Sequence, residues 1–398
     1  MIQCNSFELV YLRKIPYLIP YGQQTANLQK SVRLNETGVL IWNGLSQKKP
    51  LDRILQDILN TYELSESDRP FVQEDLYETI AQLESLHVIR NSDESDLKSD
   101  LTKKRTNDKE KYFSFCIGPL TIRCEGQNIS PLSIFFKDFL YPDQNQKIMQ
   151  HIMIKDRKPE TIHNSAVLVS RADILIKETS YCYCICLPDQ TDFYEMRIAK
   201  DASFVEIFCA HTIEPEFLFH IIRFPVLLLA QIKKCFFLHS ASILFQEKAW
   251  LFSGSSGTGK STHTRLWHTF LDAPYLNGDL NMIGMKNDHY IVYGQPWCGT
   301  SKIYTTADHP LGGIVFLKQS DKNHWQSMTS DQKVLQLLYR LISPSWTKDM
   351  LHKNMHFSKM LSRKVPLFSL ECTATKEACY TAKDGILFYQ KNKIFRII

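Results

Sequence analysis

The first ninety residues pass from β-type segments to helical periodicity. Phe7 to Ile19 is rich in aromatic and β-branched residues and predicts strands, which Pro16 and Pro20 keep short. A second short strand is expected at 26–34. Asn35-Glu36-Thr37-Gly38 then leads into an apolar run, which indicates a capped helix start.

Two longer helices are predicted after this start. Apolar residues recur at helical spacing over 51–62 and again over 68–87. The apolar side expected for the second of these helices comprises Phe71, Leu76, Ile80, Leu83 and Leu86. A small sheet with three helices is a winged-helix-like arrangement, and we predict it for residues 1–90.

Residues 91–111 interrupt this pattern. Leu97 and Leu101 are the only large apolar residues in the stretch, which has no aromatic residue. Such a segment cannot bury enough surface to offset the entropy of ordering it, so we expect a flexible linker.

Residues 112–235 are predicted to be rich in strands. The expected strands are 112–117, 120–124, 151–154, 166–170, 174–178, 181–187, 193–199 and 204–209. A helix over 214–233 follows. It holds the most apolar stretch of the chain, Phe217 to Ala230, which is too short to span a bilayer and contains Arg223, so a buried helix is expected.

The composition is that of a globular protein, with 44% hydrophobic and 22% charged residues. A formal net charge of +5 over 398 residues is mild, and both signs are mixed along the chain, which argues against a nucleic-acid partner. The N-terminus shows no secretory signal pattern. We therefore expect a cytoplasmic protein without a membrane partner. Its oligomeric state stays open, and a homo-oligomer is compatible with the sequence.

The cysteines do not indicate a metal site. There are 11, scattered without C-x-x-C spacing, and reduced thiols are expected in a cytoplasmic chain. Cys182, Cys184 and Cys186 alternate along one predicted strand and would share one of its faces. A core-facing or edge strand is the expected result.

The most specific motif lies in the last region, 236–398. It reads Gly254-Ser255-Ser256-Gly257-Thr258-Gly259-Lys260-Ser261 and fits G-x-x-x-x-G-K-[ST], the loop that wraps nucleotide phosphates. A strand at 249–252 precedes it and a helix at 261–270 follows, as a phosphate loop requires.

This motif predicts ATP and Mg²⁺ as ligands. The nucleotide would be held by residues 254–262, which are Gly254, Ser255, Ser256, Gly257, Thr258, Gly259, Lys260, Ser261 and Thr262. Lys260 would reach the β- and γ-phosphates, and the Ser261 hydroxyl would bind Mg²⁺.

Two further residues are candidates for the chemistry. Asp279, about eighteen residues past the loop, could activate an acceptor hydroxyl or bind Mg²⁺. His239, in the predicted strand before the loop strand, is a candidate for contact with the transferring phosphate. Cys298, in a Pro/Gly-containing loop at 293–300, is expected to be a spectator thiol.

The motifs of this last region resemble those of HPr kinase/phosphorylase-like, PEP-carboxykinase-like kinases, in the branch found in gene clusters for ribosomally made, modified peptides. The matching segments are Leu238-His239-Ser240-Ala241-Ser242, 254–262, 263–267, Asn277-Gly278-Asp279 and 296–299. The resemblance covers about 112–390. It implies a PEP-carboxykinase-type core and transfer of the ATP γ-phosphate to a Ser or Thr hydroxyl, with Asp279 as base or Mg²⁺ partner.

The chain departs from that family at two positions. HPr kinases carry two adjacent acids after the loop, whereas this chain has Gly278-Asp279. Their metal-binding Glu on a later strand has no match near 290–293. These departures leave the division between base and metal ligand open and argue against the reverse, phosphorylase reaction.

Residues 5–90 resemble the PqqD family. The match is carried by the segment Arg33 to Trp42 and by the end of the third helix, Leu83 to Ile89. The resemblance implies a domain that recognises precursor peptides, in which the leader adds as a strand to the small sheet. The alternative, a DNA-binding winged helix, is disfavoured because 68–87 has five acids, among them Glu74, Asp75, Glu78 and Glu84, against Arg69 alone.

The sequence therefore predicts a multidomain α+β and α/β protein: a winged-helix-like PqqD domain at 1–90, a linker at 91–111, a β-rich part at 112–235 and a P-loop kinase core at 236–398. The predicted function is a kinase acting on a precursor peptide recruited through its leader. Two alternatives stay open: a kinase of a small hydroxy compound such as free serine, and a non-catalytic nucleotide-binding scaffold that presents the peptide.

Overall fold

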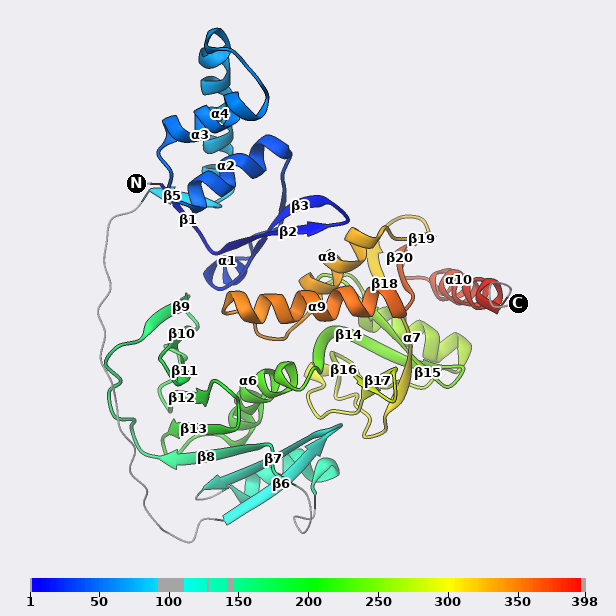
Figure 1. Cartoon of the computed structure of the whole chain (residues 1–398). Coiled ribbons are helices and arrows are strands. Elements are labelled where there is room, and N and C mark those ends of the chain that lie inside the picture. Colours follow the sequence, from blue (N-terminus) through cyan, green and yellow to red (C-terminus); the bar gives the residue numbers. More distant parts are fainter. Residues whose placement is uncertain (1, 92–110, 127–128, 142–146, 395–398) are drawn as a thin grey trace. The chain divides into compact units, whose positions relative to one another are not determined.

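The computed structural model describes residues 2–91, 111–126, 129–141 and 147–394 (Figure 1). These residues divide into two compact units. The first contains Met1–Thr102, Ile162–Lys177 and Ser345–Leu351, and the second contains Lys103–Thr161, Glu178–Pro344 and His352–Ile398. The predicted linker at 91–111 lies outside the described residues except at its two ends.

The first unit contains the predicted small sheet and three helices. Its elements are β1 (Ile2–Cys4), β2 (Phe7–Leu12), β3 (Ile15–Pro20), α1 (Gln23–Ala26), β4 (Val32–Arg33), α2 (Glu36–Ser46), α3 (Leu51–Thr61), η1 (Glu66–Asp68), α4 (Arg69–Ser85) and β5 (Ile89–Asn91). Strands β2, β3 and β4 form one sheet in that order, and β1 pairs with β5. The Asn35 side chain accepts a hydrogen bond from the Gly38 backbone at 2.7 Å, which confirms the predicted helix cap.

Two predictions for this unit were wrong in detail. The segment expected as a strand at 26–34 is mostly loop, with α1 before it and only the two residues of β4 extended. In α4, Phe71 is 72% exposed and Leu86 is 44% exposed. Val72 contacts the core instead, since it is spaced by four residues from Leu76, and Leu86 lies just beyond the end of the helix.

The first unit also takes in two later segments. Ser170, at the end of β9 (Ala166–Ser170), donates its backbone N–H to Gln23 Oε1 at 2.6 Å. Lys348 Nζ lies 2.9 Å from Glu8 Oε2. The predicted division placed these two segments in the regions 112–235 and 236–398. Their association with the first unit was not predicted, because contacts between distant segments leave no local pattern in a sequence.

The second unit begins with a sheet and a long helix. The elements are β6 (Lys111–Ile117), β7 (Leu120–Gly126), α5 (Ser130–Ser133), η2 (Ile134–Phe139), β8 (Gln150–Asp156), β11 (Cys182–Cys186), β12 (Phe193–Ala199), β13 (Phe204–Cys209) and α6 (Pro215–Ile232), with β10 (Leu175–Glu178) between β9 and β11 in the chain. The strands lie in the order β6-β7-β8-β13-β12-β11. The eight strands predicted between 112 and 209 are confirmed to within two residues at each end.

Helix α6 is buried, as predicted. By length and composition it is the one helix among the described residues that could cross a membrane, and 61% of this stretch is buried within the fold. Cys182 and Cys184 are also buried, with their sulfur atoms 3.7 Å apart, so these two face the core. The described residues contain no cluster of three or more His, Cys, Asp or Glu able to hold a metal ion.

The rest of the second unit is built on a ring of strands. Its elements are β14 (Phe236–Phe245), β15 (Lys248–Ser253), α7 (Lys260–Leu271), β16 (Leu280–Lys286), β17 (His289–Tyr293), η3 (Gly299–Ser301), β18 (His309–Gln319), β19 (His324–Ser327), α8 (Ser330–Arg340), α9 (Lys348–Lys364), β20 (Leu367–Cys372) and α10 (Lys376–Ile394). The pairings β15-β14-β16-β17-β18 close back on β15, and β20 and β19 extend the sheet from β18.

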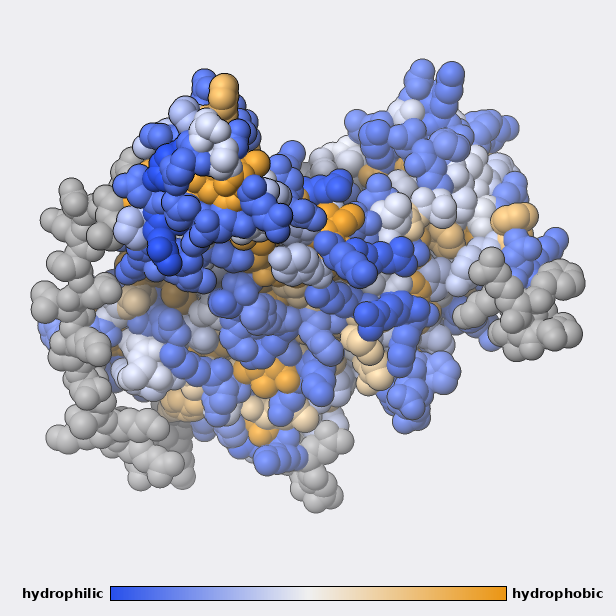
Figure 2. All heavy atoms as spheres, turned by 45° about the horizontal axis from the view of Figure 1, so that its top comes forward, coloured by the Kyte–Doolittle hydropathy of each residue, from blue (hydrophilic) through white to orange (hydrophobic). Residues whose placement is uncertain are grey.

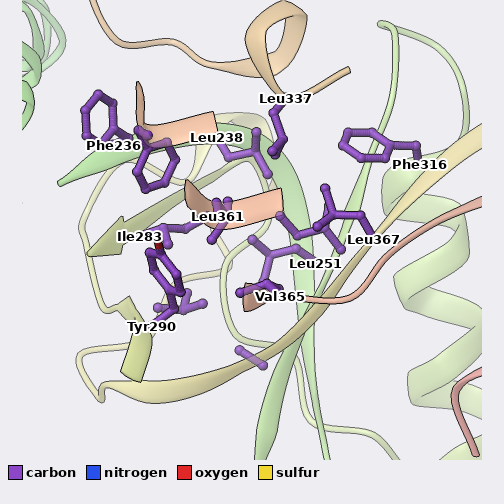
Figure 3. Close-up of a cluster of buried hydrophobic side chains, with 14 of the residues drawn as sticks. Phe236, Leu238, Leu251, Ile283, Tyr290, Phe316, Leu337, Leu361, Val365 and Leu367 are labelled. Atoms are coloured by element: carbon purple, nitrogen blue, oxygen red, sulfur yellow. The ribbon is translucent and has the colours of Figure 1, made fainter. Parts of the chain in front are cut away.

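Two buried clusters hold this ring in place. In one, Leu361 of α9 and Val365, just after this helix, pack with Leu238 and Leu251 of the central strands (Figure 3). In the other, Trp267 of α7 and several residues of α10 pack with Phe252 and neighbouring strand residues. Hydrophilic residues predominate on the face seen in Figure 2, and the hydrophobic ones form separate spots, as on an ordinary globular surface.

Candidate active site

Strand pairing gathers the predicted site residues at one edge of the ring. Strand β14 is antiparallel to β15, with Ser240 opposite Ser253, so the start of β14 lies beside the end of β15. His239 is opposite Leu280 in the next pair of strands, β14 and β16. Asp279, one residue before β16, therefore lies near His239 and near the loop that follows Ser253.

The phosphate loop has the conformation that its glycines permit. Gly257 and Gly259 have φ angles of +79° and +87°, in the left-handed region. A Cβ atom on Gly254 would lie 2.6 Å from Thr258 Oγ1 and 2.9 Å from the Leu317 carbonyl oxygen. Glycine is thus required for the close return of the loop on itself.

Side chains brace the loop and leave it accessible. Thr258 Oγ1 donates to the Ser255 carbonyl at 2.8 Å, and Gln319, the last residue of β18, donates to the Gly257 carbonyl at 2.8 Å. Ser255, Ser256, Gly257 and Ser261 are exposed. The loop therefore leads into the N-terminus of α7 with its outer surface open, the arrangement that binds phosphate groups.

Two cations lie on the first residues of the loop. Lys260 Nζ donates to the Gly254 and Ser255 carbonyls at 3.4 and 3.3 Å. Arg340, the last residue of α8, donates from Nη2 to Ser255 Oγ at 2.9 Å. Burial lowers the pKa of Lys260, the charge of Asp279 opposes this, and the charge of Arg340 adds to it.

Asp279 is held as a charged carboxylate beside His239. The Asp279 Oδ1 atom lies 3.3 Å from His239 Nε2. The hydrogen bond from His239 lowers the pKa of Asp279 against the effect of burial, and the charges of Arg223 and Lys260 lower it further. His239 was predicted to contact the phosphate, and the structure brings it to the carboxylate.

A buried polar network fixes the backbone around Asp279. Asn281 Nδ2 donates to the Ser240 carbonyl at 2.7 Å, and Asn281 Oδ1 accepts from Ser242 Oγ at 2.7 Å and from Asn277 Nδ2 at 3.1 Å. Both asparagines are fully buried. Two of these links join the segment around Asp279 to β14 and the third joins the two ends of the segment, so the network sets the position of the carboxylate.

The position of the missing first acid is filled by a neighbour. A Cβ atom on Gly278 would lie 2.0 Å from Ser301 Oγ and 2.7 Å from Ser301 Cβ. A Cβ on Gly299 would lie 3.1 Å from Asp279 Oδ2. The loop that ends in η3 thus packs directly on this segment, and no side chain fits at 278.

We expect Gly278→Asp to destabilise the second unit by about 3 kcal/mol, because the new side chain would displace the η3 loop. Urea unfolding of the full chain would measure this. Gly278→Asp combined with Ser301→Gly is the matched control and should recover at least half of the loss. A single variant as stable as the wild type would contradict the packing described here.

Cys298 lies near the carboxylate but is not activated. Burial raises the pKa of its thiol, and the charge of Asp279 raises it further. A thiol with a raised pKa is a poor nucleophile, which fits the predicted spectator role. Its neighbour Trp297 donates from Nε1 to the Phe219 carbonyl of α6 at 2.9 Å and so ties this loop to the helix.

Arg223 and Arg340 were not identified from the sequence. Arg223 is partly buried on α6, and the charge of Asp279 offsets the lowering of its pKa by burial. It makes no ion pair with another described residue. A charged residue inside the most apolar stretch of the chain was the signal that could have found it. Arg340 ends an amphipathic helix, where a charged residue is ordinary, so the sequence around it did not mark it as a site residue.

The buried side chain of His263, on α7, makes the stability of the fold depend on pH. It is 2% exposed, accepts a hydrogen bond from Trp267 Nε1 at 3.1 Å, and its burial lowers its pKa to about 3. The imidazole is therefore neutral in the folded protein, and below pH 6.5 the unfolded chain binds the extra proton. Stability should be complete above pH 6.5 and fall below it by at most about 1.4 kcal/mol per pH unit from this group.

Denaturant unfolding between pH 7.5 and 5 would measure this loss. His263→Asn keeps an acceptor for Trp267 but does not titrate, so its stability should depend less steeply on pH than that of the wild type. Equal slopes for the two proteins would rule out His263 as the cause.

The residues present are compatible with Mg²⁺. This ion commonly binds proteins through one or two carboxylates or hydroxyls and takes its other ligands from water and nucleotide phosphates. Ser261, with its exposed hydroxyl at the first turn of α7, and Asp279, held charged, supply such a pair. A site of this kind needs no cluster of three protein ligands.

Comparisons with known proteins bear on the N-terminal part. No curated protein matches the chain. Among solved structures it is similar to the HPr(Ser) kinase/phosphatase from Coxiella burnetii, at 10% identity and a TM-score of 0.24, covering 39% of this chain and 97% of that one; a similarity this low carries no argument. Residues 21–89 match the family model of coenzyme PQQ synthesis protein D (PqqD), so this part of the chain is PqqD-like, as predicted.

Proposed function

We propose that the protein is an ATP- and Mg²⁺-dependent kinase that phosphorylates a Ser or Thr of a ribosomally made precursor peptide. The observation that carries the proposal is the charged carboxylate of Asp279, 3.3 Å from His239, at the same edge as the phosphate loop with Lys260. Phosphoryl transfer needs little beyond such an arrangement: phosphate held in place, charge neutralised and an acceptor hydroxyl oriented.

Each residue has a defined role in this proposal. The amides of residues 254–262 bind the α- and β-phosphates, and the Lys260 ammonium reaches the β- and γ-phosphates. Ser261 and Asp279 would hold Mg²⁺, which would supply positive charge to offset that of the phosphates. Asp279 accepts the proton of the acceptor hydroxyl as the new O–P bond forms and the bond to the leaving ADP oxygen breaks. His239 orients Asp279 through its hydrogen bond.

The PqqD-like part gives the proposal its substrate class. A PqqD-like domain would bind the leader of the precursor by addition of a strand to an edge of the small sheet, whose edge strands are β2 and β4. Tethering the leader raises the effective concentration of the rest of the peptide at the active site. Weak contacts with the acceptor residue would then suffice.

The test is transfer of labelled phosphate from [γ-³²P]ATP with Mg²⁺ by the full chain. The acceptors are the peptide encoded beside this gene, the same peptide without its leader, and free serine. We expect label on the intact peptide and at least tenfold less without the leader. Label on free serine alone would support a small-molecule kinase, and nucleotide binding without label on any acceptor would support a scaffold.

A further inference from the structure

Arg340 reaches the phosphate loop from a distant part of the chain. It ends α8, 85 residues after Ser255, and its Nη2 donates to Ser255 Oγ at 2.9 Å. The Nε atom of the same guanidinium is buried and has no hydrogen-bond partner. Among the described residues, no acid forms an ion pair with Arg340.

The charge of Asp279 acts on Lys260, whereas Arg340 has no ion pair with an acid among the described residues. Lys260 Nζ lies 3.3 Å from the Ser255 carbonyl, so both cations contact the same loop residue. Burial lowers the pKa of Arg340, and the charge of Arg340 lowers that of Lys260. The two positive charges beside Ser255 repel each other, and an anion bound between them would attract both.

The place of Arg340 along the loop indicates which part of a nucleotide it meets. The lysine of a phosphate loop reaches the β- and γ-phosphates, while the amides at the helix start hold the phosphates nearer the nucleoside. Arg340 contacts the hydroxyl of Ser255, and the ammonium of Lys260 contacts the carbonyl of the same residue, so the guanidinium lies at the Lys260 end of the loop. A guanidinium is also suited to bind two phosphate oxygens at once.

We propose that Arg340 binds the terminal phosphate of the nucleotide and makes the site selective for triphosphate over diphosphate. The inference rests on the proposed function for the identity of the ligand, a nucleotide. It does not depend on which acceptor receives the phosphate. In this role Arg340 gives up or shares its hydrogen bond to Ser255 when the nucleotide binds.

The experiment is calorimetric titration of the full chain with Mg·ADP and with Mg·AMP-PNP, which has a γ-phosphate but is not hydrolysed at the β,γ-bridge. Arg340→Met keeps the aliphatic stem and removes the charge. We expect its affinity for Mg·AMP-PNP to fall about 10- to 100-fold and its affinity for Mg·ADP to fall less than about threefold. Arg340→Lys should recover part of the loss.

Arg69→Met is the matched control, because it makes the same change of side chain at an arginine of α4 in the first unit, where Arg69 pairs with Glu66 at 3.4 Å. If Arg340 binds phosphate, Arg69→Met should keep its affinity for both nucleotides within about threefold of the wild type. Equal losses for the two nucleotides in Arg340→Met, no loss at all, or the same selective loss in Arg69→Met would overturn the inference. Thermal melts of each variant show whether it is folded, and Arg340→Lys serves if Arg340→Met is not.

The outcomes separate this inference from the proposed function. Selective loss of Mg·AMP-PNP affinity without phosphate transfer to any peptide would uphold the role of Arg340 and reject the peptide kinase. Transfer to the peptide with unselective nucleotide binding in Arg340→Met would do the reverse. A wild-type chain that binds neither nucleotide would reject both.

Discussion

Asp279→Asn is expected to reduce phosphate transfer about 10³-fold and to weaken Mg·nucleotide binding by no more than about tenfold, since the amide keeps an oxygen that can bind Mg²⁺. Asparagine has nearly the same shape, so it fits beside Gly299 and the His239 ring. It cannot take the proton of the acceptor hydroxyl. The loss should therefore appear in kcat, measured with saturating Mg·ATP and peptide, while calorimetry reports the binding of nucleotide.

His239→Gln is the control for this variant. Glutamine can still donate a hydrogen bond to Asp279, so transfer should fall much less than in Asp279→Asn. The low pKa of Asp279 adds a second check. Its carboxylate stays charged until the pH falls below the range in which such groups usually titrate. Protonation of Asp279 should therefore not lower the rate of phosphate transfer between pH 5 and 8. Unchanged transfer in Asp279→Asn would show that the reaction proceeds without this carboxylate.

The conformation of the loop at 254–261 and its flanking elements could be predicted because their determinants are contiguous. The glycines, the lysine and the flanking strand and helix occupy 248–271, and each leaves a local mark: left-handed backbone at Gly257 and Gly259, an apolar strand before them and a helix after. The strands between 111 and 209 were equally readable, because alternation within each strand suffices to find it. The helix cap at Asn35 is local in the same sense.

The surroundings of Asp279 could not be predicted, because they depend on which strands pair. Asn277 and Asn281 are the buried links that position the carboxylate against β14, and this role follows from the pairing of β14 with β16. Closing the ring from β18 to β15 brings Gln319 to the loop. Arg340 arrives from α8 in the same way. Such contacts are set by tertiary packing, which no window of sequence contains.

Gly278 illustrates the limit of a motif comparison. From the sequence it was the position of an absent acid, and this left the division between base and metal ligand open. In the structure Ser301 occupies the space that a side chain at 278 would need. Glycine at 278 is thus matched by the packing of the η3 loop against it. The surrounding structure accommodates one carboxylate in this segment, that of Asp279.

Lys260→Ala is expected to weaken Mg·ATP binding at least about tenfold and to reduce phosphate transfer about 10³-fold or more. Its ammonium is the cation nearest the loop carbonyls of Gly254 and Ser255, and its partial burial means that water cannot replace it fully. Stability should change little, because the loop is also braced by Thr258 and Gln319.

Lys260→Arg keeps the charge on a larger head group and should retain more nucleotide affinity than Lys260→Ala. Calorimetry and the labelling assay on the same preparations separate the three functions considered for this chain. Loss of both binding and transfer in Lys260→Ala supports a kinase, for the peptide or for a small compound. Loss of binding in a chain whose wild type transfers nothing supports the scaffold. If Lys260→Ala binds Mg·ATP as tightly as the wild type, the loop at 254–261 does not bind the phosphates, and all three proposals fail together, because each of them requires that contact.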